Sequence, residues 1–320
     1  MDQDVLLRLY QVMLRIRRFE EKVVALYPEQ EMRTPVHLCI GQEAIAAGVC
    51  DHLRPDDFLF STHRNHGHCL AKGMAPAELA AEFYGKITGC ARGKGGSMHP
   101  VAPEIGIPGA TAIVGGGIPI AVGAALACAM RNQDAVSVVF FGDGAAEEGS
   151  FHESLNFAAL KKLPVVFVCE NNLYATASPI AQRQSGPGIA EKAAGYGMPG
   201  ERLDGNDVVA VHRVAGLAVQ RARQGRGPTL IEALTYRWKG HVGPEDDTVK
   251  GVRPAEELRA WQERCPLRRH HACLERHGIV SQGLLEDLER RIASELDDAF
   301  QRARSAPPPA PEELLTNVFA

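Results

Sequence analysis

The 320-residue sequence lacks the marks of several protein classes. Its formal net charge is only −4, with basic and acidic residues mixed along the chain. Nucleic-acid-binding domains need a clustered basic excess, so we expect no nucleic-acid partner. The first residues, MDQDVLLRLYQ, include acidic side chains where a secretion signal has basic ones. We therefore expect no signal peptide and a cytoplasmic location.

Paired metal-binding or redox cysteines are also lacking. The eight cysteines include no pair at C-x-x-C spacing. Most lie in apolar surroundings, as Cys169 does in PVVFVCE. This pattern favours reduced core cysteines in a cytoplasmic protein.

Charge is missing from one long segment, Ile105 to Met130. That length would suffice to cross a bilayer, but the segment contains several glycines and two prolines. It is better interpreted as a Gly-rich loop entering a small-residue helix at about 118–131. Small residues permit close approach of another backbone, so we expect no membrane insertion. We expect the segment to be largely buried, much of it near a subunit contact.

The rest of the chain alternates helical and strand patterns. Apolar spacing predicts an amphipathic helix over 5–27. Short apolar runs predict strands at 135–141 and 164–170 around a helix at 147–161, a βαβ unit of a parallel sheet. A helix at 207–224, a strand at 229–238 and polar helices from about 255 follow, before an extended, mobile tail at 306–313. We predict one α/β domain over 1–320, with a largely parallel, doubly wound sheet and helical additions at both ends.

Polar residues follow both strands of the βαβ unit. Gly142-Asp143-Gly144 comes after the first strand, and Asn171-Asn172 follows 26 further residues. Since ligands bind at the carboxyl ends of parallel strands, Asp143 and Asn172 can offer oxygen atoms to one cation. Such ligands suit Mg²⁺, which keeps places for water and phosphate oxygens. A dinucleotide-binding turn is the alternative, with Glu170 as its ribose acid, but Glu147 stands where its third glycine belongs.

GDG-x26-NN resembles the thiamine-diphosphate signature. The surrounding sequence resembles the alpha subunits of pyruvate, branched-chain 2-oxo acid and acetoin dehydrogenase complexes. Further similar segments occur in the family's order: HLCIGQEA (37–44), HRNHGH (63–68), GKGGSMH (93–99), AIVGGGIP (112–119) and YRWKGH (236–241). The resemblance covers about residues 5 to 300.

The resemblance implies a set of site residues. Asp143 and Asn172 match magnesium ligands, and Tyr174 matches the residue that supplies a backbone carbonyl. His66 and His241 match histidines facing the reaction centre, and His241 also matches a cofactor contact. The remaining cofactor contacts are the diphosphate-binding Arg64, its neighbour His63 where Tyr is common, Val114 at the aminopyrimidine, and the backbone of Gly144 and Ala145.

The resemblance also implies partners and a reaction. Thiamine enzymes need an activating glutamate and a second sheet domain, and the chain has room for neither. Both would come from a beta subunit in an alpha2-beta2 assembly, and we do not assign the glutamate to Glu43. The implied activity is thiamine-diphosphate-dependent decarboxylation with reductive acylation of a lipoyl group on an acyltransferase. The substrate, a 2-oxo acid or acetoin, stays open. The alternatives are the diphosphate-binding subunit of a split transketolase-like enzyme and a non-catalytic nucleotide-binding domain.

Overall fold

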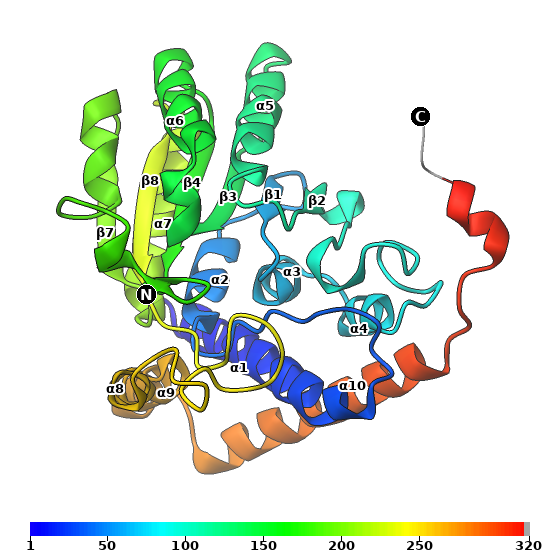
Figure 1. Ribbon diagram of the computed structural model, residues 1–320. Helices are drawn as coiled ribbons and strands as arrows, with labels where there is room; N and C mark the ends of the chain where they lie inside the picture. The colour runs from blue at the N-terminus through cyan, green and yellow to red at the C-terminus, as the bar shows by residue number, and fades with distance from the viewer. Residues whose placement is uncertain (317–320) are drawn as a thin grey trace.

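A parallel sheet forms the centre of the computed structural model, which describes residues 1–316 (Figure 1). Among these residues, six strands pair in the order β2-β1-β3-β4-β8-β7, all parallel. The strands are β1 (Phe58–Ser61), β2 (Gly109–Ala110), β3 (Ser137–Gly142), β4 (Val165–Asn171), β7 (Gly200–Asp204) and β8 (Thr229–Leu234). The predicted doubly wound α/β fold is confirmed.

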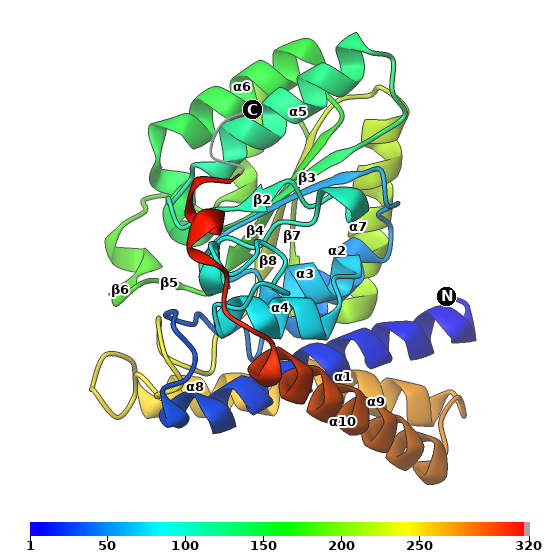
Figure 2. The same cartoon turned by 90° about the vertical axis from the view of Figure 1, so that its right-hand side faces the viewer.

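Alternate residues of the central strands enter two separate cores, because successive strand side chains point to opposite faces. Val138 and Phe140 face one core, whereas Val139 and Phe141 face the other. Helices α5 (Gly117–Met130) and α6 (Gly149–Lys161) cover the second face. Helices α2 (Glu43–Cys50), α3 (His66–Lys72) and α7 (Val208–Arg223) lie on the first (Figure 2).

Terminal helices form an outer layer beneath α2 and α3. The first, α1 (Gln3–Leu26), packs against α2, α9 (Pro266–Arg276) and α10 (Gln282–Ser305). Helix α4 (Pro76–Phe83) also contacts α10, and α8 (Ala255–Glu263) precedes α9. Short elements complete the chain: a hairpin of β5 (Tyr174–Ala175) with β6 (Ser178–Pro179), and 3-10 turns that include η4 (Asp143–Glu147), η5 (Ile180–Gln182) and η7 (Pro311–Leu315).

Three expectations differ from the structure. Strand β8 ends at Leu234 because its pairing with β4 ends there, and Trp238 N–H instead bonds to Ile40 O. The tail is not extended throughout, since η7 forms where Glu313 pairs with Arg92. The uncharged segment is less buried in the single chain than expected, as Ile113, Ile120 and Met130 are exposed. Among the described residues, no helix is both long and apolar enough to cross a membrane.

A buried ion pair joins α1 to α2. Arg17 Nε donates to Glu43 Oε1 at 2.6 Å, and neither side chain is appreciably exposed. The same carboxylate oxygen accepts the Gly41 N–H at 3.0 Å, and the Arg17 guanidinium lies over the Trp238 ring. Glu43 therefore holds the segment before α2 in place through one of its two carboxylate oxygens.

Removing one partner of this pair leaves an uncompensated buried charge. We expect Arg17→Met to lower the free energy of unfolding by about 3–5 kcal/mol. The matched control is Arg15→Met on the same helix, whose partner Glu295 is half exposed; it should cost only about 0–1 kcal/mol. Urea unfolding followed by circular dichroism measures both. Equal, small changes would show that the Arg17–Glu43 pair is not a stabilising contact.

Candidate functional site

A cleft opens at the carboxyl edge of the sheet, where β1, β3 and β4 end. Strand β1 leads outward to β2 while β3 leads the other way to β4, so the chain reverses direction between them. Such a switch point is where open α/β sheets bind ligands. The cleft is lined by Thr62, His63, Arg64, Thr111, Ile113, Val114, Gly115, Gly142, Asp143, Gly144, Ala145, Glu170, Asn172, Tyr174, Ala175, Thr176 and His241.

The turn after β3 buries a carboxylate at the cleft floor. Asp143 begins η4 and is 1% exposed. Gly144 follows, and a Cβ there would lie 2.9 Å from Ala175 Cβ, closer than side chains normally approach. The glycine therefore lets the β5 hairpin lie directly against the turn.

Arg183 is the cation that pairs with the buried Asp143 carboxylate. Its guanidinium forms ion pairs with both Asp143 and Glu147. Gln184 Nε2 adds hydrogen bonds to Asp143 O at 3.1 Å and to Glu147 Oε1 at 3.0 Å. Burial raises the pKa of Asp143 above its ordinary value, against the opposing effect of the Arg183 guanidinium. The Asp143 position thus accommodates a positive group.

The residues after β4 present oxygen atoms at the same edge. Asn172 Nδ2 donates to Gln42 Oε1 at 3.2 Å, which fixes the amide orientation, while its Oδ1 accepts the Tyr174 N–H at 3.4 Å. Asn172 and Tyr174 line the cleft together with Asp143. A carboxylate, an amide oxygen and backbone carbonyls form a donor set that fits a hard dication such as Mg²⁺.

The segment after β1 brings a buried guanidinium to the cleft. Arg64 Nη1 donates to Leu38 O at 2.6 Å, and Nη2 donates to His241 O at 3.1 Å. Burial and the nearby Arg237 lower the pKa of Arg64 to about 10. The group still carries its charge at neutral pH, so it can attract an anion entering the cleft.

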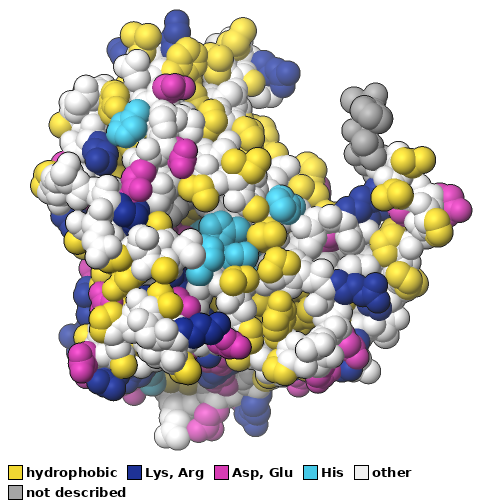
Figure 3. Space-filling model, in the orientation of Figure 1, with side chains coloured by type: hydrophobic (Ala, Val, Ile, Leu, Met, Phe, Trp, Pro, Cys, Tyr) yellow, Lys and Arg dark blue, Asp and Glu magenta, His cyan; other side chains and the backbone are white. Residues whose placement is uncertain are grey.

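His63 and His241 line the cleft as neutral imidazoles. Burial, with the positive field of Arg64, lowers the pKa of His63 to about 3 and that of His241 to about 4. Their rings lie 5.3 Å apart, and the ring of His37 lies within 5.2 Å of each. Histidine side chains gather near the centre of the face of the molecule that is seen in Figure 3.

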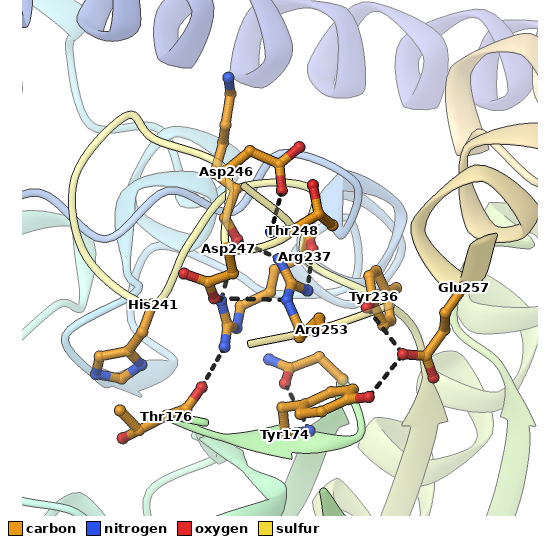
Figure 4. A network of polar contacts seen from close by, with 12 residues as sticks. Tyr174, Thr176, Tyr236, Arg237, His241, Asp246, Asp247, Thr248, Arg253 and Glu257 are labelled. Atoms are coloured by element: carbon orange, nitrogen blue, oxygen red, sulfur yellow. Dashed lines mark hydrogen bonds and ion pairs between the residues drawn. The ribbon is translucent and has the colours of Figure 1, made fainter. Parts of the chain in front are cut away.

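Two buried arginines hold the loop that carries His241 (Figure 4). Arg237 Nη1 donates to Asp247 Oδ2 at 2.7 Å and to Lys239 O at 3.0 Å, while Nη2 donates to Thr176 O at 2.6 Å. Arg253 donates to the carbonyls of Arg237 and Lys239 at 2.7 and 2.9 Å. Residues 237–253 thus close on themselves around the Asp247 carboxylate and position His241 over the cleft.

The structure does not bring His66 into the cleft, contrary to the expectation. His66 is fully buried, with Nδ1 bonded to the carboxylate of Glu20 and Nε2 to Ser97 Oγ at 2.7 Å. Its ring packs against Phe83. Because His66 starts α3 while His63 and Arg64 precede it, the helix turns its side chain into the core. Both ring nitrogens are occupied, so the geometry supports a positioning role.

One residue beside the cleft floor was not predicted from the sequence, and Glu170 was considered only as the acid of a dinucleotide-binding turn. Arg183 has no recognisable motif, and its place beside Asp143 depends on the fold of the β5–β6 segment. Glu170 lines the cleft at the end of β4 and lies 3.2 Å from His68 Nε2, whose Nδ1 contacts Ser61 Oγ at 2.8 Å. The position of Glu170 after an apolar strand was the available signal. Val114, by contrast, lies in the cleft wall as expected.

These features define the class: an α/β protein with a polar cleft at the carboxyl edge of a parallel sheet. The chain belongs to the dehydrogenase E1 component family, whose model matches residues 11–312. It is 43% identical over 317 residues to the alpha subunit of acetoin:2,6-dichlorophenolindophenol oxidoreductase from Bacillus subtilis, covering 99% of this chain and 94% of the relative. The Cupriavidus necator protein of that name is 40% identical, with 100% and 95% covered.

A second kind of relative matches equally fully. The pyruvate dehydrogenase E1 component subunit alpha of Porphyra purpurea is 41% identical over 322 residues, covering 98% of this chain and 93% of the relative. Similarity therefore extends along the whole chain for relatives with two different substrates in their names.

The loop clasp yields a testable expectation. Asp247→Asn should remove the charge that pairs Arg237 with Arg253, leaving two buried guanidinium groups facing each other. We expect residues 239–253 to open, so that limited proteolysis cuts there at least ~10-fold faster, in line with a loss of about 1.4 kcal/mol or more. The control is Asp246→Asn, whose carboxylate accepts only the Thr248 N–H. Equal cleavage of the two variants would refute the clasp.

Proposed function

We propose that the chain is the alpha subunit of a thiamine-diphosphate-dependent 2-oxo acid or acetoin dehydrogenase, passing an acyl group to a lipoyl arm on a partner acyltransferase. The observation that carries this proposal is the buried Asp143 carboxylate, which shares the cleft edge with Asn172 and Tyr174 and is matched by a cation. Family membership supports thiamine diphosphate as the cofactor. The names of the relatives support both pyruvate and acetoin as substrate classes.

Under this proposal the chain holds the diphosphate half of the cofactor. Asp143, Asn172 and the Tyr174 carbonyl would hold Mg²⁺, with its remaining positions left for water and phosphate oxygens. His63, Arg64 and the backbone of Gly144 and Ala145 would contact the diphosphate, and Val114 the aminopyrimidine. The bound cofactor supplies an electron sink for cleavage of a carbon–carbon bond. The chain positions that group and moves protons around it.

His241 is the proton-transfer residue in this scheme. Its neutral imidazole lines the cleft, held by the Asp247 clasp and by Arg64 at its own carbonyl. Opening of the lipoyl disulfide requires a proton at the departing sulfur. Beside Arg64 alone the imidazole is neutral; the negative charge of a bound diphosphate would raise its pKa, and the protonated ring would then deliver the proton.

The cleft of the single chain does not complete the active site. Within residues 1–316, the carboxylates that line it are Asp143 and Glu170, and both already have partners in Arg183 and His68. The activating glutamate of the proposal would therefore come from a beta subunit. Exposed apolar side chains beside the cleft, Ile113, Val114 and Ile120, are suited to that contact. An alpha2-beta2 assembly of single-domain alpha chains in the cytoplasm completes the proposal.

A split transketolase-like enzyme is the alternative class, because the diphosphate-binding half of such enzymes also has a Gly-Asp-Gly turn after a strand. The segments GKGGSMH and YRWKGH, and the names of the relatives, favour the dehydrogenase. Transfer to acceptor sugars against transfer to lipoamide separates the two in one assay.

Asp143→Ala tests the cofactor site. The substitution removes the charged member of the ligand set, so thiamine diphosphate should bind at least ~10-fold more weakly in the presence of Mg²⁺. Isothermal titration of the assembled subunits, with and without Mg²⁺, measures the change, and Asp298→Ala at an exposed position serves as control. Unchanged affinity in the Asp143 variant would remove Asp143 from the metal site.

His241→Ala tests the acyl-transfer role. We expect reductive acylation of a lipoyl domain to slow by ~10² to 10⁴-fold, and more than turnover with 2,6-dichlorophenolindophenol, which needs no proton on sulfur. Both half-reactions are measured at saturating cofactor, with His277→Ala, at an exposed position just after α9, as control. Equal losses would assign His241 to binding or to an earlier step.

A further inference from the structure

Three histidines from distant parts of the sequence meet at the cleft. His37 precedes α2, His63 follows β1, and His241 lies in the loop after β8. One ring nitrogen of each lies within 4.8 Å of one nitrogen of the other two. Ring centroids are separated by 4.6 Å for His37–His63, 5.2 Å for His37–His241 and 5.3 Å for His63–His241.

The positions of these three imidazole rings are not fixed by hydrogen bonds to the ring nitrogens. In the part of the chain that the structure describes, no ring nitrogen of the three forms a hydrogen bond, and Nδ1 of the 7%-exposed His37 is buried without a partner. By contrast, His66 and His68 have both ring nitrogens engaged. Buried polar groups are normally satisfied, so the orphaned Nδ1 of His37, beside the two partly exposed imidazoles of His63 and His241, points to a ligand.

Hydrogen bonds to the backbone hold the segments that carry the three histidines together. Arg64 donates to Leu38 O, next to His37, and to the carbonyl of His241. His63 directly precedes Arg64 in the chain, so this one guanidinium links the backbone of all three histidines. Gly243 N–H also donates to Val36 O at 2.8 Å, tying the His241 loop to the segment that carries His37. The three side chains are thus brought together by a fixed framework and not by chance proximity of mobile loops.

We propose that His37, His63 and His241 form a binding site for a transition-metal dication such as Zn²⁺, separate from the oxygen-donor site at Asp143. Zinc bound by imidazole has Zn–N distances of about 2.0–2.1 Å, which puts the nitrogens of a tetrahedral site roughly 3.4 Å apart. Side-chain movements of about 1 Å close the observed spacing to that geometry. Three protein ligands leave a fourth position open to the cleft for water or an anion.

The donor set selects the metal. Imidazole nitrogens suit zinc, copper and nickel, whereas Mg²⁺ prefers oxygen. Imidazole ligates metals in its neutral form, which is the form that burial favours. The positive field of Arg64 opposes a dication here, but Arg64 is already shared between two carbonyls and would stabilise an anion in the fourth position.

Occupation of this site would compete with the cofactor, a consequence that rests on the proposed function. His63 is a proposed diphosphate contact and His241 a proposed proton donor, and a shared metal ion would hold both imidazoles. Zn²⁺ would therefore act as an inhibitor that excludes the cofactor, whereas Mg²⁺ would assist it.

Metal titration of the full chain, without cofactor or substrate, tests the site directly. Zn²⁺ is titrated against a chromophoric zinc indicator, and Co²⁺ is added separately to record its coordination spectrum. We expect one site per chain, with a tetrahedral Co²⁺ spectrum. His37→Gln and His63→Tyr should each weaken Zn²⁺ binding by at least ~100-fold, since even partners that only support a ligand change affinity by about 10–100-fold. His212→Gln, in the separate His52–His212 pair, should leave binding intact.

His63→Tyr also separates metal binding from folding. A tyrosine lacks the imidazole nitrogen, so this variant should lose Zn²⁺ while its circular-dichroism spectrum and thermal unfolding match those of the unsubstituted chain. In the assembled subunits, Zn²⁺ added first should weaken thiamine diphosphate binding by the unsubstituted protein, whereas in His63→Tyr it should not change that variant's own affinity.

The outcomes are distinct. Failure of the unsubstituted chain to bind Zn²⁺, unchanged binding in His37→Gln and His63→Tyr, or loss in His212→Gln instead would overturn the site. Zinc binding without any effect on cofactor affinity would overturn the competition alone. Absence of thiamine diphosphate binding by the assembled subunits with Mg²⁺ and without Zn²⁺ would defeat the proposed function and leave the metal result standing.

Discussion

The carboxylate of Asp143 is the constraint around which the cleft is arranged. It is buried at the end of a central strand, where an unpaired negative charge is costly. The chain supplies Arg183 from a segment forty residues later in sequence, and Glu147 and Gln184 complete the contact. A site that already balances a carboxylate with a cation needs little rearrangement to hold a dication and a diphosphate. Arg183 would then be free to pair with the anion, so the same charges serve both states of the cleft.

The cleft wall that carries His241 is held rigid by a second group of paired charges, Arg237, Asp247 and Arg253. Arg237 and Arg253 lie side by side in the interior and would repel each other without Asp247. Tyr236 stacks on Trp261, and its hydroxyl shares the Glu257 carboxylate with Tyr174. Tyr174, at the β4 edge, is therefore tied to the same framework as the His241 loop. The residue proposed as a metal ligand and the residue proposed for proton transfer are thus joined by one polar network.

The sequence predicted those parts of the fold whose pattern is local. The apolar runs of β3 and β4, joined by a helix of ordinary length, indicated a parallel βαβ unit, and the GDG and Asn pair then had to meet at one edge. Strands β1 and β7 escaped because FLFS is short and GERLD is polar; pairing with β3 and β8 makes them strands. His66 was placed wrongly because a motif gives sequence neighbours, whereas the start of α3 separates them in space. Arg183 was invisible because only the folded hairpin brings it to Asp143.

The two ends of the cleft differ in the chemistry of their donors, and this difference gives the chain two distinct responses to metal ions. At the β3–β4 edge, carboxylate, amide and carbonyl oxygens favour a hard ion that keeps its water and can share phosphate oxygens. At the other end, nitrogens that have no hydrogen bonds favour a softer ion. Tyrosine is common at the place of His63 in the resembling subunits, and a tyrosine there would leave two imidazoles, one fewer than the three protein ligands of an open zinc site. Under the proposal, a single replacement of tyrosine by histidine converts a diphosphate contact into the third ligand of an inhibitory metal site.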